Sequence, residues 1–356
     1  MPFYTYAPKK VLGGEKIMNN LVVFGGGTGL SCLLSGLKLF PVDVTTVITV
    51  SDNGSSTGVL KKELEIPAVG DIGKVLISMA NVDEDFIRLL RYRFSKDGSL
   101  KNHPVRNIML AALIDLKGNL TEATRYMCRL LNIKGTVLPL TEEVVELVGE
   151  SKDQIHNFFG EEEVSQNIRH ITRLRYDHEV HASQEIVDKI KEADLIIFSS
   201  GSLYTSILPH LIVDDIVNAI NQSAAPILYV CNLVTQPGET DHYNVSDHLR
   251  VLNQYLQSRK VDIVIANNSQ IDDSVRKHYL VTENKTVVNL DRQLVEQTGA
   301  EIMEDDIFCI DDGKIRHDAL KTAFLIFSYL MAKSNQRLTP QFTDEKSPRI
   351  YHPSAK

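Results

Sequence analysis

Five short apolar segments of this chain each end in a polar or glycine-containing loop. They lie at 21–24, 42–50, 194–199, 225–231 and 261–266. The first is followed by a glycine loop and a helical pattern over 30–40, after which the second begins. Strand, glycine loop, helix and strand in this order predict a parallel sheet with helices on its faces. We therefore expect a Rossmann-like α/β fold, with a mostly parallel sheet flanked by helices.

The residues between the second and third of these strands follow a different pattern. Helical periodicity runs over 72–93, 105–116 and 120–131, and Pro104 suits a helix start. Short strands of an antiparallel meander are predicted at 136–138, 144–148, 154–159 and 170–176. We interpret about 84–180 as an inserted helical and antiparallel β subdomain within one domain spanning 19–335. Residues 1–18 are interpreted as a disordered leader or the result of an upstream start, and 336–356 as a flexible tail.

Composition limits the function classes. The 356 residues include 38 Lys and Arg against 46 Asp and Glu, a net charge of −8. This balance argues against a general binder of nucleic acids or anionic membranes. The four cysteines are widely spaced, which favours a reducing compartment over a disulfide framework or a zinc site. The longest apolar stretch, 322–332, is far shorter than the ~20 residues of a membrane span and predicts a buried helix. The first 17 residues lack the apolar core of a secretory signal, so we expect a cytoplasmic protein without a membrane span.

The loop GGGTGL at 25–30 is the strongest indication of a binding site. Glycines let backbone N–H groups approach a phosphate, and a helix N-terminus adds partial positive charge. The loop fails both the GxGxxG and the GK[ST] fingerprints, so a tight turn without a ligand remains the alternative. The phosphate-binding candidates here are Gly25, Gly26, Gly27, Thr28 and Gly29.

Polar residues after the other strands extend the predicted site. Asp52, in SDNGSSTG, is placed to accept from a ribose hydroxyl or to hold a divalent ion beside a diphosphate. A solvated turn is the alternative for this loop. By the same reasoning the candidates at helix starts and loop ends are Asn53, Ser55, Ser56, Asp71, Asn107, Gly201, Ser202, Thr205, Asn232 and Gln236. Arg106 is a phosphate candidate too, with a surface arginine as the favoured alternative.

Two residues near the C-terminus complete the predicted pocket. Tyr279 follows a short helix from about Asp272 and could stack on a base, and Arg316, at the start of the final helix, could pair with a diphosphate. The alternatives are a core position for Tyr279 and a surface pair with Asp311 or Asp312 for Arg316.

The search for catalytic and metal-binding residues identifies none. No GxSxG occurs, and Ser200-Gly201-Ser202 has no His–Asp partner that the sequence places beside it. His178 and His181 lack a third ligand and are interpreted as surface residues. We assign no catalytic residue and no metal ligand, and expect Mg²⁺ at most as a companion of a diphosphate.

The motifs taken together identify a family. GGGTGL, SDNGSSTG, GDIGK, HPVRN, GSLYTSILPHL and NLVTQPGET, in this order, resemble the gluconeogenesis-factor family, relatives of the 2-phospho-L-lactate transferases, over roughly 20–335. The resemblance implies a Rossmann-like fold that binds a UDP-sugar or another nucleotide diphosphate, with NAD as a mimic. It also implies a cytoplasmic role in cell shape and wall synthesis during growth on gluconeogenic carbon sources. The sequence does not give the oligomeric state, but this fold often pairs, which leaves a homodimer open. Protein partners in cell-wall synthesis or regulation are not identified by the resemblance.

The chain departs from the family pattern at three motifs. The usual DDGGSSG has Asn53 in place of its second acid, GDIRN is GDIGK, and GHSLGN is NHPVRN. The loss of an acid weakens a two-carboxylate metal site more than nucleotide binding. We therefore favour a regulatory protein that binds a nucleotide sugar without turnover. The alternative is a transferase that moves a 2-phospholactyl-type group from a nucleotide diphosphate to an acceptor alcohol, and a nicotinamide dehydrogenase ranks third.

Overall fold

A computed structural model describes residues 18–152, 156–311 and 313–338. Seven strands form one sheet in the order β10-β9-β8-β7-β1-β2-β3, and every pairing is parallel. Their bounds are β1 (Asn19–Gly25), β2 (Val42–Ile48), β3 (Thr136–Pro139), β7 (Leu195–Phe198), β8 (Ile227–Val230), β9 (Ile263–Asn267) and β10 (Glu301–Asp305). All five strands expected from the apolar segments are present, so the mostly parallel α/β fold is confirmed.

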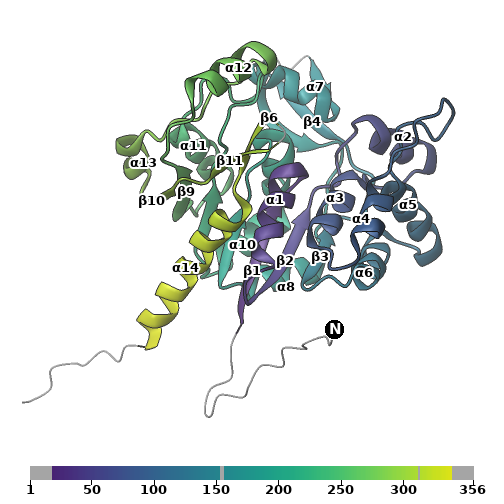
Figure 1. Ribbon diagram of the computed structural model, residues 1–356, viewed down its shortest axis with the longest axis horizontal. Coiled ribbons are helices and arrows are strands. Elements are labelled where there is room, and N and C mark those ends of the chain that lie inside the picture. The colour runs from purple at the N-terminus through teal and green to yellow at the C-terminus, as the bar shows by residue number, and fades with distance from the viewer. Residues whose placement is uncertain (1–17, 153–155, 312, 339–356) are drawn as a thin grey trace, which may run out of the picture.

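The direction of strand addition reverses beside β1. From β1 the chain adds β2 and β3 on one side, and the later strands β7 to β10 extend the sheet on the other. Because parallel crossovers are right-handed, the reversal places the connecting helices on opposite faces. On one face α1 (Gly27–Leu37) contacts α3 (Gly70–Met79) and the last helix, α14 (Ala319–Leu338) (Figure 1). Ligands in such sheets bind outside the carboxyl ends of the strands at the reversal.

The helices of the other face precede or connect strands β7 to β10 along the chain. Helices α8 and α10 pack together there, as do α11 and α13. The bounds in this half are α8 (Gln184–Lys191), the π-helix η2 (Leu203–Ile207), α9 (Leu208–Leu211), α10 (Asp214–Gln222), α11 (Val245–Tyr255), α12 (Asp273–Glu283) and α13 (Arg292–Thr298). Four-residue strands such as β7 and β8 are buried along their whole length, which is why they read as continuous apolar runs.

Helices and a small antiparallel sheet lie between β2 and β7, within and just before the residues 84–180 interpreted as an insertion. The helices are α2 (Ser55–Leu64), α3, α4 (Glu84–Arg91), α5 (Val105–Lys117) and α6 (Leu120–Leu130), and they gather at the right of Figure 1. The antiparallel sheet pairs β4 (Leu147–Ser151) with β5 (Asn157–Phe159) and β6 (Ile171–Tyr176), and α7 (Gly160–Asn167) with the short helix η1 (Ile168–His170) connects β5 to β6.

Three predictions in this region were wrong. The strand expected at 136–138 is β3, which pairs with β2 in the main sheet and not in the insertion. The helix expected over 72–93 is two helices, because the chain leaves helical geometry at Ala80 and Asp83 caps the next one. SDNGSSTG is not all loop, since α2 begins at Ser55. The first residues of the strand expected at 154–159 lie outside the described residues. The strand itself is β5, which begins at Asn157.

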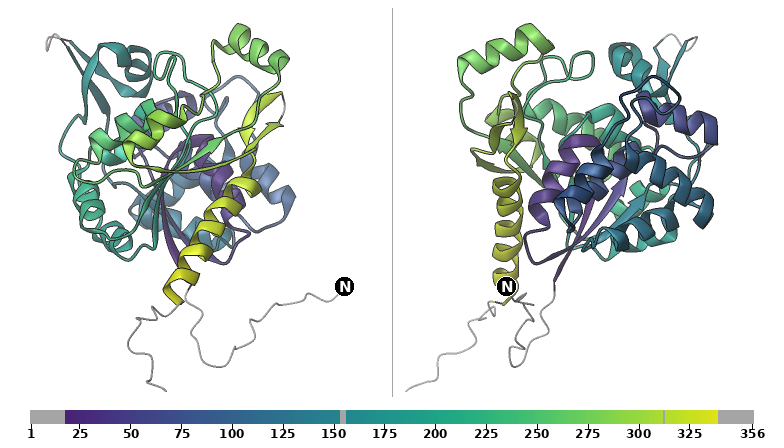
Figure 2. Two further views of the ribbon diagram at one scale, coloured as in Figure 1. Left: turned by 90° about the vertical axis from the view of Figure 1, so that its left-hand side faces the viewer. Right: turned by 45° about the vertical axis from the view of Figure 1, so that its right-hand side comes forward.

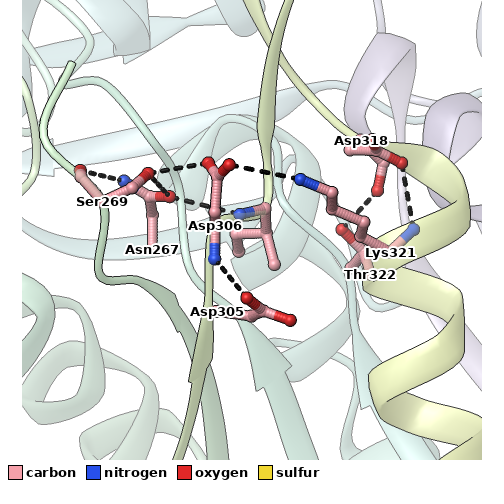
Figure 3. Close-up of polar contacts among 8 residues, drawn as sticks. Asn267, Ser269, Asp305, Asp306, Asp318, Lys321 and Thr322 are labelled. Carbon is pink, nitrogen blue, oxygen red and sulfur yellow. Dashed lines mark hydrogen bonds and ion pairs between the residues drawn. The ribbon is translucent and has the colours of Figure 1, made fainter.

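A hairpin before the last helix returns the chain to the centre of the sheet. It consists of β11 (Phe308–Asp311) and β12 (Lys314–His317). Arg316 therefore lies on a strand, and not at the start of the final helix as predicted. Figure 3 shows the polar contacts that fix this connection: Ser269 Oγ donates to Asp306 Oδ1 at 2.7 Å, and Lys321 pairs with Asp306 Oδ2 at 3.2 Å.

Helix α14 was expected to be buried, and only part of its surface is. Ala323 and Ile326 face the body of the protein, and α1 approaches so closely that a Cβ on Gly36 would lie 2.0 Å from Ala319 O. Leu320 and Phe324 are exposed, and Figure 2 shows the helix at the edge of the molecule.

Helix α14 ends at Leu338, so 336–338 are helical and not part of a tail. The predicted leader and the rest of the tail lie outside the described residues. Within the described chain, no helix is both long and apolar enough to cross a bilayer.

Candidate functional site

A crevice of about 330 Å³ lies at the carboxyl ends of β1, β7 and β8, where the order of strands reverses. Nine of the predicted residues line it: Gly26, Gly27, Thr28, Gly29, Gly201, Ser202, Asn232, Gln236 and Arg316. The sequence did not identify the other lining residues, which are Cys32, Glu161, Ser200, Ser206, Leu233, Val234, Lys285, Ile315 and His317. Residues from both ends of the chain therefore meet in one crevice.

The glycine loop forms the N-terminus of α1. Gly26 precedes the helix without a side-chain cap, so the first N–H groups of α1 remain available to an anion. Gly27 has φ +64°, a left-handed conformation that favours glycine, and only Asp71 Oδ2 lies near, at 4.0 Å from where a Cβ would be. A Cβ on Gly29 would lie 2.0 Å from Ser200 O. This contact requires glycine and holds the first loop against the second.

The second loop, Ser199–Ser202, is fixed by its neighbours. Gly201 N donates to Asn232 Oδ1 at 2.9 Å, and Asn232 Nδ2 donates back to Gly201 O at 2.7 Å. Ser202 Oγ donates to the buried carboxylate of Glu239 at 2.6 Å and accepts from Thr205 N at 3.0 Å. Glu239 was not predicted, because nothing in TQPGET distinguishes a carboxylate that holds a loop from one that faces solvent.

Three acidic side chains lie beside the glycine loop. Burial, and then the nearby charges of Asp52 and Asp71, raise the pKa of Glu161 to about 8, so it is largely protonated at neutral pH. Thr205 Oγ1 donates to Glu161 Oε1 at 3.1 Å, and a Cβ on Gly26 would lie 2.6 Å from Asp71 Oδ2. The cluster joins α7 of the insertion to the loops of the main sheet. A protonated carboxyl group here can donate a hydrogen bond to a ligand.

Two cationic side chains contribute to the crevice from the C-terminal part of the chain. The side chain of Arg316, on β12, has no hydrogen-bond or ion-pair partner among the described residues, so its guanidinium remains available to an anion. Lys285 follows α12 and pairs with Glu283 at 2.6 Å. The predicted surface pair of Arg316 with Asp311 is absent, and Asp312 lies outside the described residues. Placed with the glycine loop in one crevice, these cations suit a ligand with more than one negative charge.

A serine and a histidine contact each other at the back of the crevice. His317 Nε2 donates to Cys231 O at 3.0 Å, which leaves Nδ1 to accept from Ser200 Oγ at 3.3 Å. Burial lowers the pKa of His317 to about 4, so the ring is neutral. The sequence predicted that this serine motif lacks a placed His–Asp partner. The structure supplies the histidine from β12, 117 residues later, and a backbone carbonyl takes the place of the acid.

The other predicted residues lie around the crevice and not on its lining. Gly25 is buried at the end of β1, and Asn53 Oδ1 accepts from Glu161 N at 3.1 Å, which anchors α7. Ser56 Oγ contacts both His103 and Asn107 in a buried cluster, and Ser55 is exposed at the start of α2. Tyr279 lies within α12 and not after it. It is buried, and its hydroxyl accepts from Ile315 N at 2.5 Å, so it supports the wall of the crevice from behind.

Metal coordination has no support in the described part of the chain. No group of three or more His, Cys, Asp or Glu side chains there is arranged to hold a metal ion. His178 pairs with Glu143 and Asp177, and His181 with Asp215, on the surface. The free cysteines Cys32 and Cys309 both donate to His317 O.

Comparison with known proteins identifies the family of this chain. A family model described as 2-phospho-L-lactate transferase CofD matches residues 21–308. The gluconeogenesis factor of Bacillus subtilis is 39% identical over 311 residues, which are 87% of this chain and 98% of that protein. The chain belongs to the gluconeogenesis-factor family, within the wider CofD family.

Further members of this family show the same relationship in sequence and in fold. A putative gluconeogenesis factor of Thermotoga maritima is 40% identical over 86% of this chain and 98% of its own length. The crystal structure of a Bacillus halodurans protein superimposes with a TM-score of 0.83 at 36% identity, covering 87% of this chain and all of that one. The resemblance drawn from the motifs is confirmed.

Proposed function

We propose that the crevice binds a nucleoside diphosphate, with a UDP-sugar as the preferred candidate and NAD as a mimic. The observation that carries the proposal is the position of the glycine loop at the strand reversal, with Arg316 and Lys285 in the same crevice. The diphosphate would accept hydrogen bonds from the first N–H groups of α1 and pair with these cations. Asn232 and Gln236 are placed to contact the sugar or the base.

We propose a regulatory role, because no described group of residues forms a complete catalytic set. The ligand would act as a signal of cell-wall precursor supply, in the cytoplasm, through a protein that controls cell shape on gluconeogenic carbon sources. The relatives support this through their name, which links them to gluconeogenesis. A homodimer is part of the proposal. Mg²⁺ would bind only together with the diphosphate, and the proposed regulatory role does not require it.

The second candidate is a transferase of the type that names the matching family model. The observation in its favour is the protonated carboxyl group of Glu161 close to Asp52 and the glycine loop. Such a pair can donate and accept a proton while an acceptor alcohol attacks a diphosphate. Asn53, in place of an acid, weighs against metal-assisted transfer.

Titration calorimetry and thermal unfolding with UDP-sugars, GDP and NAD test the proposal. A ligand present at 100 times its Kd should stabilise the protein by ~2.7 kcal/mol. Arg316→Ala should lose most of that stabilisation. If no nucleotide diphosphate shifts the melting temperature, the proposal is wrong. Release of a nucleoside monophosphate in the presence of an acceptor alcohol would favour the transferase.

A further inference from the structure

Arg106 is a buried cation without an anionic partner. The residue is only 7% exposed, and its side chain forms no ion pair or hydrogen bond with any described residue, while Nε is fully enclosed. A buried charge is costly unless it is paired. Most arginines that are this enclosed pair with a carboxylate, and the favoured interpretation of Arg106 from sequence, a surface arginine, was wrong.

The position of the guanidinium group follows from its contact with α3. A Cβ on Gly73 would lie 3.0 Å from Arg106 Cδ and 3.3 Å from Nε, so the side chain crosses the first turn of α3 where no side chain opposes it. On that turn Lys74 pairs with Asp71 at 2.8 Å. Arg106 therefore lies beside a second cation, close enough for the charges of Arg106 and Lys74 to interact.

The surrounding charges are mainly positive. Arg91 and Arg93, at the end of α4 and just after it, are near enough to disfavour the charged form of Arg106, and Asp71 is the one acid that favours it. Burial is the main reason why the pKa of Arg106 falls to about 10. Arg91 and Arg93 are exposed and form no ion pair within the described chain. One buried and two exposed arginines, with Lys74, thus outnumber the nearby carboxylates, which are Asp71 and, beside Lys74, Asp52.

Asn107 supplies a second, independent unpartnered polar atom next to this cluster. It is 2% exposed, and its Oδ1 has no hydrogen-bond partner, although Nδ2 lies 3.4 Å from Ser56 Oγ. Helices α2, α3 and α5, which meet here, all begin without a hydrogen bond from an N-cap side chain. Consecutive residues of α5 thus carry an enclosed donor, Arg106 Nε, and an enclosed acceptor, Asn107 Oδ1, which suit a group that can both accept and donate.

We propose that Arg106, Lys74 and Asn107 bind the phosphate group of a small phosphorylated molecule, with Arg91 and Arg93 at the entrance. A phosphate fits better than a carboxylate, because a second negative charge matches the excess of cations and a monoprotonated phosphate can also donate to Asn107 Oδ1. The net charge of −8 argues against a nucleic acid as the source. The site is separate from the nucleotide crevice and does not depend on the function proposed for it.

Thermal unfolding of the full chain with increasing inorganic phosphate, at constant ionic strength, tests the proposal. The wild-type melting temperature should rise with phosphate, and Arg106→Met should abolish that rise. Without phosphate, Arg106→Met should melt at the same temperature or higher, because it removes an unpaired buried charge. A structural role for Arg106 predicts the opposite, a lower melting temperature at every phosphate concentration, and that result would overturn the proposal.

Three further variants keep the interpretation unambiguous. Arg316→Ala, in the nucleotide crevice, should keep the phosphate response, and loss of the response there alone would place the phosphate in the crevice and refute the second site. Arg88→Met is the matched control, because Arg88 is exposed on α4 and already pairs with Asp85. If Arg106→Met does not fold, Arg91→Ala/Arg93→Ala should still weaken phosphate binding by roughly threefold to tenfold. An unchanged phosphate affinity in this double variant would equally refute the site.

Discussion

Asn232 and Gly201 form a reciprocal pair of hydrogen bonds at 2.9 and 2.7 Å, which joins the ends of β7 and β8. Asn232→Ala removes both bonds, so we expect a loss of ~1–3 kcal/mol in the free energy of unfolding. Nucleotide affinity should fall as well, because the Gly201 amide loses its fixed orientation. Urea unfolding and calorimetry measure the two effects. Full stability in the variant would show that the loop is held by Glu239 and Gly29 alone.

Gly27→Val should abolish nucleotide binding, because it places a side chain in the crevice and Gly27 has φ +64°. Backbone strain should also cost about 1–2 kcal/mol of stability. Gly118→Val is the matched control, since Gly118 has φ +89°, lies at the end of α5 and has nothing within 4 Å of where a Cβ would be. The control variant should lose a similar amount of stability but keep its affinity for the nucleotide. Unchanged affinity in Gly27→Val would mean that the loop is only a turn.

Arg316 and Tyr279 were both predicted to bind the ligand, but their substitutions should have different effects. We expect one to lower ligand affinity and the other to lower stability. Arg316→Ala should weaken a nucleotide diphosphate by ~1.5–3 kcal/mol, since a charged hydrogen bond is lost, with a nearly unchanged melting temperature. Tyr279→Phe should instead lower stability by ~1–3 kcal/mol, because Ile315 N loses its acceptor in a buried position. A large loss of affinity with unchanged stability in Tyr279→Phe would contradict its position behind the wall.

Glu161 makes stability depend on pH. Its pKa is raised in the folded protein, so the stability it contributes is complete below the unfolded value near 4.5 and is lost as the pH rises to about 8. The side chain of Glu161→Gln cannot ionise. As the pH rises across this range, the wild-type melting temperature should therefore fall relative to that of the variant. Melting curves at pH 5, 7 and 9 test this, in which a constant difference would show that Glu161 is ionised throughout. Exposed Glu162→Gln provides the control.

The central part of the fold could be predicted because its signals are local. Short buried strands and the glycine loop at 25–30 are adjacent in sequence, and strand direction places their ends at one edge. The hairpin of β11 and β12 could not be predicted in the same way, since DDGKIRHD is polar and looks like a helix start. Its position depends on Tyr279 and on contacts of Asp306, which are tertiary.

Residues that enter the site from distant elements were missed for the same reason. Glu161 comes from α7, in a stretch interpreted as a meander, and His317 comes from the hairpin. The burial of Arg106 depends on Gly73 of another helix, which no periodicity within α5 reveals. Sequence patterns show which side of a helix is apolar, but they do not show which neighbour leaves room for a charged side chain.

The place of β12 in the crevice has a consequence for how the protein is made. The glycine loop leaves the ribosome early, whereas Arg316 and His317 emerge almost 290 residues later. A nascent or C-terminally truncated chain thus has the glycine loop without Arg316 opposite it. Since a ligand stabilises only the species that binds it, a nucleotide should protect the finished protein from proteolysis and leave incomplete chains exposed to it. Ligand binding would in this way report that synthesis has passed the hairpin of β11 and β12.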